Sequence, residues 1–160
     1  MRIAVVVVLA VLVPAVAAAG IFVPGKNAPA PALAGEDPIS GKPVSLAQWA
    51  GKPLLVNLWG SWCHPCRDEA KQLRMFLAKH PRAVLGIDVE DSSGGAKRFR
   101  KRYKVSFPSI ADPKDVLANR LKATGTPITY FLDRRHRIVA TLYGAGTLKV
   151  FESGWKLATT

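Results

Sequence analysis

The stretch VNLWGSWCHPCRDE, residues 56–69, carries both cysteines of this 160-residue chain. The apolar run LLVNLW, residues 54–59, has the length of a buried strand, and a helical pattern follows the second cysteine until His80. A helix that starts here places Cys63 at its N-terminus, where free amide groups and the helix dipole stabilise an anion. We therefore expect Cys63 to be an accessible thiolate, with Cys66 one turn further along and within reach of the same sulfur.

Three other uses of the two cysteines fit the sequence less well. A structural disulfide across so short a loop restricts little of the unfolded chain. A zinc site needs four ligands, and the three histidines, His64, His80 and His136, follow no zinc-ligand spacing. Two inert core thiols are not expected at a helix start that follows a strand. The pattern favours a redox pair that needs no metal and no cofactor, in which Cys63 attacks a disulfide and Cys66 resolves the mixed disulfide.

Four neighbours of the cysteines are candidate site residues. A protonated His64 would lower the pKa of the preceding thiol, and an exposed spacer is the alternative interpretation. Pro65 needs no amide partner early in a helix, so it shapes the helix start. Glu69 lies three residues after the second cysteine and can exchange a proton with the resolving thiol, unless it is a solvated first-turn acid. Trp62 is expected on the apolar surface that a substrate contacts.

The first residues determine where the chain is expected to work. Residues 3–23 form an uncharged apolar run, long enough to cross a bilayer as a helix, which takes about 20 residues. Small residues at Ala17 and Ala19 leave a cleaved signal peptide as the alternative, but the run continues past them and favours an uncleaved anchor. We predict a signal anchor or signal peptide over residues 1–25 and one folded domain over residues 26–160.

The charge around the apolar run predicts its orientation. Arg2 is the only charged side chain before the run, so the positive-inside rule places the N-terminus in the cytoplasm. The folded domain then lies on the extracytoplasmic side of the cell membrane, attached by a single span, where disulfide chemistry is permitted.

The chain carries a formal net charge of +12, with basic clusters at residues 97–104 (KRFRKRYK) and 133–137 (DRRHR). Solvated helix and turn faces are the simplest interpretation. Attraction to an anionic membrane surface or to an acidic partner is the functional alternative. Nucleic-acid binding is not expected of an exported chain without a matching motif.

The rest of the chain alternates strand and helix patterns. The Pro- and Ala-rich residues 26–35 predict a tether, and the turn residues of ISGKPVSL, residues 39–46, predict a small N-terminal hairpin. The remaining patterns predict strands over residues 83–89 and 105–110, helices over residues 96–103, 115–122 and 147–157, and an antiparallel hairpin of residues 128–132 and 137–143.

Several of these motifs occur in the order found in one protein family. GKPLLVNLWGSWC (51–63), WCHPC (62–66), GIDVEDS (86–92) and GTPITYFLD (125–133) together resemble the thioredoxin fold. The resemblance covers about residues 26–157 and is closest to the exported, membrane-tethered TlpA/ResA/DsbE (CcmG) group of thiol-disulfide oxidoreductases. It implies an α/β thioredoxin-like fold with a mixed central sheet flanked by helices, an N-terminal β-hairpin and a central αβ insertion.

The same resemblance implies a substrate-binding element far from the cysteines in sequence. It predicts a cis peptide between Thr126 and Pro127, packed beside the CxxC motif, where the backbone of Thr126 pairs with an extended substrate strand. Without the resemblance, Pro127 is simply a proline at the entry to a strand. Asn57 stands where ordinary thioredoxins carry a buried aspartate.

The resemblance also implies a role. It predicts a monomeric protein-disulfide reductase that keeps the haem-binding cysteines of apocytochrome c reduced and receives electrons from a membrane thiol-disulfide carrier. An oxidant that forms disulfides in secreted proteins is the alternative, since His64 beside Cys63 would stabilise the thiolate and make the disulfide more oxidising. A non-enzymatic binding module on the same scaffold is a third possibility, although the chain lacks the CxxxC motif expected for copper delivery.

Overall fold

Strand β4 (Leu54–Trp59) is the central strand of the structure and is buried along its whole length. Its side chains alternate between two core clusters: Val56 and Leu58 belong to one, and Leu55 and Trp59 belong to the other. A strand that is apolar on both faces requires cover on both faces, which accounts for the layered architecture of this computed structural model. The structure describes residues 20–160.

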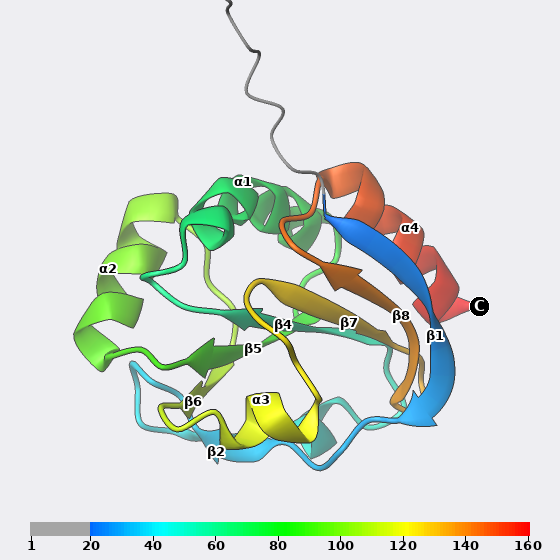
Figure 1. Ribbon diagram of the computed structural model, residues 1–160, viewed down its shortest axis with the longest axis horizontal. Coiled ribbons are helices and arrows are strands. Elements are labelled where there is room, and N and C mark those ends of the chain that lie inside the picture. Colours follow the sequence, from blue (N-terminus) through cyan, green and yellow to red (C-terminus); the bar gives the residue numbers. More distant parts are fainter. Residues whose placement is uncertain (1–19) are drawn as a thin grey trace, which may run out of the picture.

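The main sheet has six strands in the order β1-β8-β7-β4-β5-β6 (Figure 1). Strands β4, β5 and β6 run parallel, whereas β7 is antiparallel to β4, β8 to β7, and β1 to β8. Strands β2 and β3 pair separately and antiparallel. The bounds of the other strands are Ile21–Pro29 (β1), Ala34–Glu36 (β2), Pro43–Ser45 (β3), Val84–Val89 (β5), Ser109–Asp112 (β6), Ile128–Leu132 (β7) and Arg137–Tyr143 (β8).

Helices cover both faces of this sheet, as Figure 1 shows. Helices α1 (His64–Lys79), α2 (Ser93–Tyr103) and α4 (Leu148–Thr159) pack on one face, where their apolar residues share a core cluster with Leu55 and Trp59. The short helix α3 (Val116–Arg120), the 3₁₀ turn η1 (Leu46–Trp49) and the small β2–β3 sheet cover the other face. The predicted mixed sheet flanked by helices is confirmed.

Strand β1 is the largest departure from the sequence prediction. Residues 26–35, predicted as a tether, instead supply the second half of β1 and the start of β2. Strand β1 pairs with β8 at the edge of the sheet, and its register shifts between Pro24 and Ala28. An edge strand needs a ladder on one side only, so prolines without an amide proton are tolerated there. The Pro- and Ala-rich composition therefore did not exclude a strand.

The third predicted strand is displaced toward the C-terminus. Strand β6 covers Ser109–Asp112 rather than residues 105–110. Val105 and Phe107 are buried in the core cluster, but they lie in the loop that leads into the strand. Their apolar pattern thus reflected burial and not strand pairing. The predicted hairpin of β7 and β8 and the last helix, which Thr147 caps, are confirmed.

No helix within residues 20–160 has the length and apolar character needed to cross a bilayer. Residues 3–19 of the predicted anchor lie outside the described residues, and residues 21–23 belong to β1. The anchor, and with it the division of the chain into residues 1–25 and 26–160, stays a prediction.

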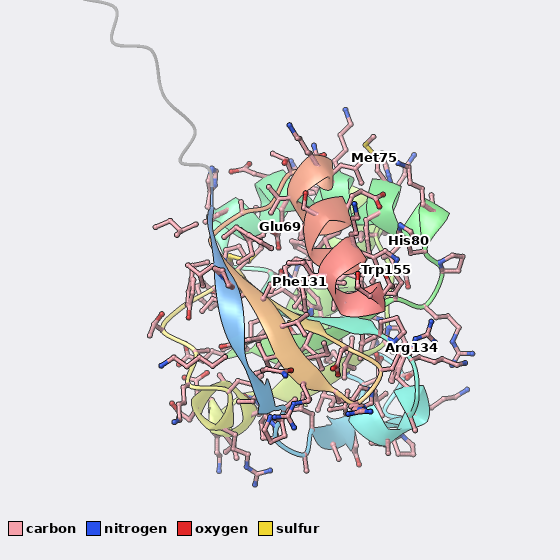
Figure 2. All side chains as sticks on the ribbon, turned by 90° about the vertical axis from the view of Figure 1, so that its right-hand side faces the viewer. Glu69, Met75, His80, Phe131, Arg134 and Trp155 are labelled. Carbon is pink, nitrogen blue, oxygen red and sulfur yellow. A yellow bond between two sulfur atoms is a disulfide. The ribbon has the colours of Figure 1, made fainter. Side chains whose placement is uncertain are left out.

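A close contact between α4 and the sheet allows a test of the packing. Gly154, within α4, faces Phe131 of β7, and a Cβ atom at position 154 would overlap the Phe131 ring. Figure 2 shows Phe131 beside α4. Gly154→Ala is expected to lower the free energy of unfolding by about 1–3 kcal/mol, because the overlap outweighs the gain of about 1 kcal/mol from helix propensity.

The measurement is urea unfolding of the oxidised protein. Gly125→Ala is the matched control, since a Cβ atom at position 125 meets no atom within 4 Å. A Gly154→Ala variant as stable as the wild type would contradict this account of the interface.

Candidate active site

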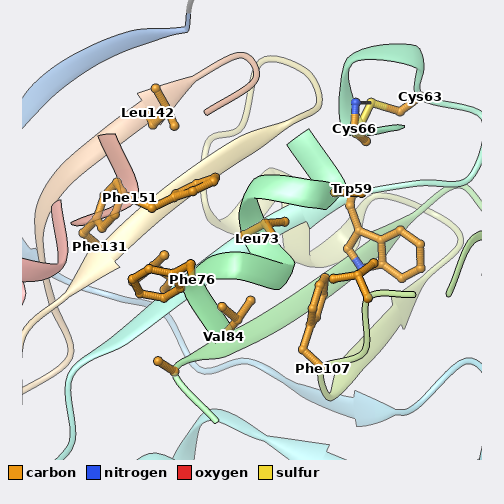
Figure 3. Packing of buried hydrophobic residues seen from close by; sticks show 14 of the residues in the cluster. Trp59, Cys63, Cys66, Leu73, Phe76, Val84, Phe107, Phe131, Leu142 and Phe151 are labelled. Atoms are coloured by element: carbon orange, nitrogen blue, oxygen red, sulfur yellow. Dashed lines mark hydrogen bonds between the residues drawn. A yellow bond between two sulfur atoms is a disulfide. The ribbon is translucent and has the colours of Figure 1, made fainter. Parts of the chain in front are cut away.

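Cys63 caps the N-terminus of α1. Its sulfur accepts a hydrogen bond from the backbone amide of Cys66 at 3.2 Å, and the two sulfurs are bonded to each other, with the Cα atoms 5.3 Å apart. Figure 3 shows the pair above the buried Trp59. The structure thus places Cys63 at the helix start that the sequence predicts. In the reduced protein, a thiolate at this position is stabilised by the free amide groups and the helix dipole.

Both cysteines are covered in this disulfide form. The exposed fraction is 2% for Cys63 and 1% for Cys66, which differs from the accessible sulfur expected at position 63. The reason is packing: both side chains belong to the core cluster under α1, and the bond to Cys66 holds the Cys63 sulfur against the helix. Trp62, the residue before Cys63, is 49% exposed. A partner that approaches Cys63 therefore meets the indole of Trp62.

The other predicted neighbours take defined positions around the disulfide. The Trp62 indole Nε1 donates a hydrogen bond to the Val89 carbonyl at 3.0 Å, which fixes the exposed ring. His64 is the first residue of α1, and its exposed ring nitrogen Nε2 lies 4.0 Å from the Asp68 carboxylate one turn later. Pro65 follows at the second helical position, where its missing amide proton leaves no bond unmade.

The peptide between Thr126 and Pro127 is cis, as the family resemblance predicts. Pro127 is buried and Thr126 is half-buried. Thr126 and Trp62 line the same cavity of about 460 Å³, so the cis-proline loop and the residue next to Cys63 are brought together. The segment before a cis-proline and the indole thus form two sides of one opening.

Glu69 is a buried acid in the core below the disulfide. Its exposed fraction is 1%, and its carboxylate accepts a hydrogen bond from Asn57 Nδ2 at 3.0 Å and another from the Gly146 amide at 2.9 Å. Burial raises the pKa of Glu69 to about 7, against the lowering effect of both hydrogen bonds. An acid with this pKa can accept and return a proton near neutral pH. The alternative of a solvated first-turn acid is wrong.

The sequence alone did not identify the residues that hold Glu69. Asn57 also donates to Thr129 Oγ1 at 2.9 Å, so one amide links β4, β7 and α1. The asparagine at position 57 was the available signal, because a polar residue in the middle of a buried strand needs partners. Gly146 contributes only a backbone amide, for which the sequence carries no signal.

A second carboxylate supports the turn before Cys63. Asp91 accepts hydrogen bonds from the Ser61 amide at 2.6 Å and from the Ser61 hydroxyl at 2.9 Å. Asp88, at the end of β5, lies beside Asp91, and burial together with the neighbouring charge of Asp91 raises the pKa of Asp88 to about 8. Ser92, the next residue, caps α2. The role of Asp91 in holding the CxxC turn was missed because it depends on tertiary contacts.

The described residues show no metal-binding cluster: within residues 20–160, no three His, Cys, Asp or Glu side chains converge on a common point. The chemistry available at this site comes from the disulfide and from Glu69. Trp62 lines two cavities beside them, the one of about 460 Å³ that it shares with Thr126 and another of about 780 Å³. This arrangement supports exchange between a cysteine pair and an external thiol or disulfide, with a proton acceptor in the core below the pair.

The comparisons with known proteins agree with this chemistry. The model of the AhpC/TSA family matches residues 24–141. Relatives include the thiol-disulfide oxidoreductases ResA of Bacillus thuringiensis subsp. konkukian, 23% identical over 76% of this chain and 72% of the relative, and of Bacillus subtilis, 27% identical over 68% of this chain and 62% of the relative.

Solved structures extend the likeness to the whole domain. A DsbF homologue from Corynebacterium diphtheriae is 33% identical, with a TM-score of 0.73 over 87% of this chain and 95% of its own. A secreted thiol-disulfide isomerase from Corynebacterium glutamicum is 29% identical, with a TM-score of 0.71 over 80% and 84% of the two chains. A thiol:disulfide interchange protein DsbE from Chlorobium tepidum, 22% identical with a TM-score of 0.72 over 85% and 99%, shares the fold.

Glu69→Gln is expected to flatten part of the pH dependence of stability. The folded-state pKa of about 7 lies above the ordinary value of 4.5, so the folded protein binds this proton more tightly than the unfolded chain. Stability is therefore fully present at low pH and falls as the pH rises from 4.5 through about 7. A pKa shift contributes about 1.4 kcal/mol per pH unit. Between these pH values the free energy of unfolding of the wild type therefore falls by up to about 3 kcal/mol more than that of the variant.

The measurement is urea unfolding of the oxidised proteins at pH 4.5 and pH 8. The raised pKa of Asp88 lowers the free energy of unfolding of both proteins as the pH rises. The difference between the two proteins in this decrease is therefore the contribution of Glu69. Equal losses in the two proteins would show that Glu69 does not titrate in this window.

Proposed function

We propose that this chain, a thiol-disulfide oxidoreductase that belongs to the AhpC/TSA family, works as an extracytoplasmic protein-disulfide reductase. The observation that carries the proposal is the Cys63–Cys66 bond at the N-terminus of α1, with Glu69 on the buried face of the same helix three residues after Cys66. A pair in this position can alternate between dithiol and disulfide without unfolding the helix.

The proposed reaction runs from the dithiol to the disulfide form. The Cys63 thiolate attacks one sulfur of a substrate disulfide, forms a mixed disulfide and releases the other substrate sulfur as a thiolate, which takes a proton from solvent. Cys66 then gives its proton to Glu69, and its sulfur attacks the Cys63 sulfur and releases the second substrate sulfur as a thiolate, which takes a proton from Glu69 or from solvent. Two electrons pass from the cysteine pair to the substrate, and a thiol carrier must return two electrons before the next cycle.

Substrate positioning is assigned to the opening between Trp62 and Thr126. A backbone that precedes a cis-proline presents its amide and carbonyl to an extended strand, and the two residues line one cavity of about 460 Å³. The fixed indole of Trp62 supplies an apolar contact next to the reacting sulfur. Pro65 and His64 complete the exposed edge of this surface.

The substrate class follows from the resemblance to the TlpA/ResA/DsbE group. We assign the chain to cytochrome c maturation, where it reduces the haem-binding cysteines of apocytochrome c and is recharged by a membrane thiol-disulfide carrier. The secreted isomerase from Corynebacterium glutamicum, which has the same fold, supports an extracytoplasmic place of work. The apolar residues 3–20, which precede β1, support attachment to the membrane by a single N-terminal anchor.

A disulfide-forming oxidant is the second candidate function. The observation that favours it is His64, which directly follows the capping cysteine at the start of α1 and can add positive charge near the thiolate. A stabilised thiolate makes the disulfide more oxidising. The reduction potential separates the two functions: a value near that of the strong oxidants, about −120 mV, would exclude the reductase.

Cys66→Ala is expected to trap mixed disulfides between Cys63 and protein substrates, because the resolving sulfur is missing. Cys63→Ala, the matched control, removes the attacking sulfur and is expected to trap none. The measurement is non-reducing electrophoresis after acid quench and thiol alkylation in cells. Equal trapping by the two variants would overturn the assignment of Cys63 as nucleophile, and no trapping by Cys66→Ala would favour a non-enzymatic binding module.

A strain that lacks this chain tests the substrate class. Its c-type cytochromes are expected to fall to a small fraction of the wild-type level, because oxidised apocytochrome cysteines cannot accept haem. Added small thiols are expected to restore the level by replacing the missing reductant. The measurement is haem staining of membrane proteins with and without added thiol, and unchanged cytochromes in the deletion strain would remove this role.

A further inference from the structure

A second opening is lined by Trp62, the residue that precedes Cys63. This groove, of about 780 Å³, lies between the N-terminal turn of α1 and helix α2. We call it the basic groove and define it by the residues that carry the argument: Trp62, Arg67, Arg98, Lys101, Arg102 and Tyr103. Because Trp62 is the residue before Cys63, the groove begins one residue from the reacting sulfur.

The groove combines an aromatic surface with a rim of one charge sign. Trp62, Phe99 and Tyr103 supply the rings, and the Arg102 guanidinium lies 5.8 Å from the centre of the Tyr103 ring. Arg67 is held at the α1 side, where its Nε and Nη2 atoms donate to the Ser61 carbonyl at 3.2 and 2.9 Å. None of the lining residues is acidic. A cleft lined by one charge sign concentrates its field on whatever enters it.

Three positive charges of α2, those of Arg98, Lys101 and Arg102, have no carboxylate partner in the part of the chain that the structure describes. Arg100 points away and pairs with Asp37 at 3.1 Å, whereas no carboxylate of residues 20–160 lies within 4.0 Å of the charged atoms of Arg98, Lys101 or Arg102. Arg98 stands three and four residues before the other two, so the three cations share one helix face. Like charges at these spacings destabilise a helix by a few tenths of a kcal/mol per pair.

The C-terminal end of a helix accounts for part of this charge, since cations there interact favourably with the helix dipole. It does not account for Arg98, which lies in the middle of α2, or for Arg67, which lies in the first turns of α1. These two side chains extend the positive lining of the groove from the first turns of α1 to the end of α2. The charge follows the groove and not the helix terminus.

We propose that the basic groove binds an acidic segment that flanks the reactive cysteine of the protein partner. The proposal rests on the proposed function and names the recognition element of the same site. A concave groove next to the disulfide suits a polypeptide, which is also what the disulfide reacts with, better than a flat anionic surface. An extended chain advances about 3.3–3.6 Å per residue, so acidic side chains about two to five positions from the substrate cysteine reach the groove.

The test compares two peptides and three proteins. Both peptides contain one internal disulfide; the first carries Asp and Glu at positions two to five on each side of the cysteine pair, and the second carries Asn and Gln at those positions. Reduced wild-type protein, Arg98→Gln/Arg102→Gln and Arg134→Gln/Arg135→Gln are mixed with each peptide, and peptide reduction is followed after acid quench. The measured quantity is the ratio of the two second-order rate constants, acidic over amide peptide.

Arg134 and Arg135 form a matched control. They are exposed in the turn between β7 and β8, outside the basic groove, and their substitution removes the same charge. Figure 2 shows Arg134 well away from Glu69. The wild type and the control are expected to prefer the acidic peptide about tenfold, and the preference is expected to fall below about twofold in Arg98→Gln/Arg102→Gln and in wild type at 1 M salt.

A wild-type ratio near one, or a ratio that the α2 variant retains, overturns the groove proposal. Sedimentation with vesicles of phosphatidylserine and phosphatidylcholine then shows whether the same cations face an anionic membrane surface. The proposed function is judged separately by reduction of the amide peptide. If wild type reduces the amide peptide without preferring the acidic one, the oxidoreductase stands and the groove proposal fails, whereas no reduction of either peptide contradicts the reductase itself.

Discussion

The hydrogen bond from the Cys66 amide to the Cys63 sulfur is the constraint around which the rest of the structure is arranged. It exists because α1 begins at His64, directly after the capping cysteine, and α1 begins there because β4 ends at Trp59 and Pro65 suits the first turn. The turn follows the C-terminal end of a central strand that is buried on both faces. The reactivity of one sulfur is therefore a consequence of where a strand ends and a helix starts.

Two acids, the buried Glu69 and the half-buried Asp91, support this arrangement. Glu69 reaches from α1 to Asn57 on β4 and to the Gly146 loop, while Asp91 fastens the Ser61 turn to the start of α2. Burial that raises the pKa of an acid also costs stability when the acid ionises. The fold accepts this cost at Glu69, where a proton acceptor with a pKa of about 7 is chemically useful.

Local patterns predicted the parts of this molecule that depend on local interactions. The run at residues 54–59, the helix after Cys63 and the β7–β8 hairpin follow from periodicity and turn residues, and the structure agrees with each of them. Strand β1 was missed because an edge strand tolerates prolines and needs only β8 as a neighbour. The bond between Asp91 and Ser61 was missed because its two residues lie thirty positions apart and meet only when β5 packs beside β4. The cis peptide at Pro127 was available only through family resemblance.

Trp62 connects the chemistry inside the domain with recognition outside it. Its indole is fixed to the Val89 carbonyl and lines both openings beside the disulfide. One opening carries the cations of α2 and the other contains Thr126 with the carboxylates of Glu90 and Asp115. A polypeptide that lies across the indole thus runs from an opening lined by positive charges to one lined by negative charges. A partner with an acidic segment on one side of its cysteine is favoured only when that segment lies in the positive opening. The two openings together can therefore select the orientation of a partner as well as its identity.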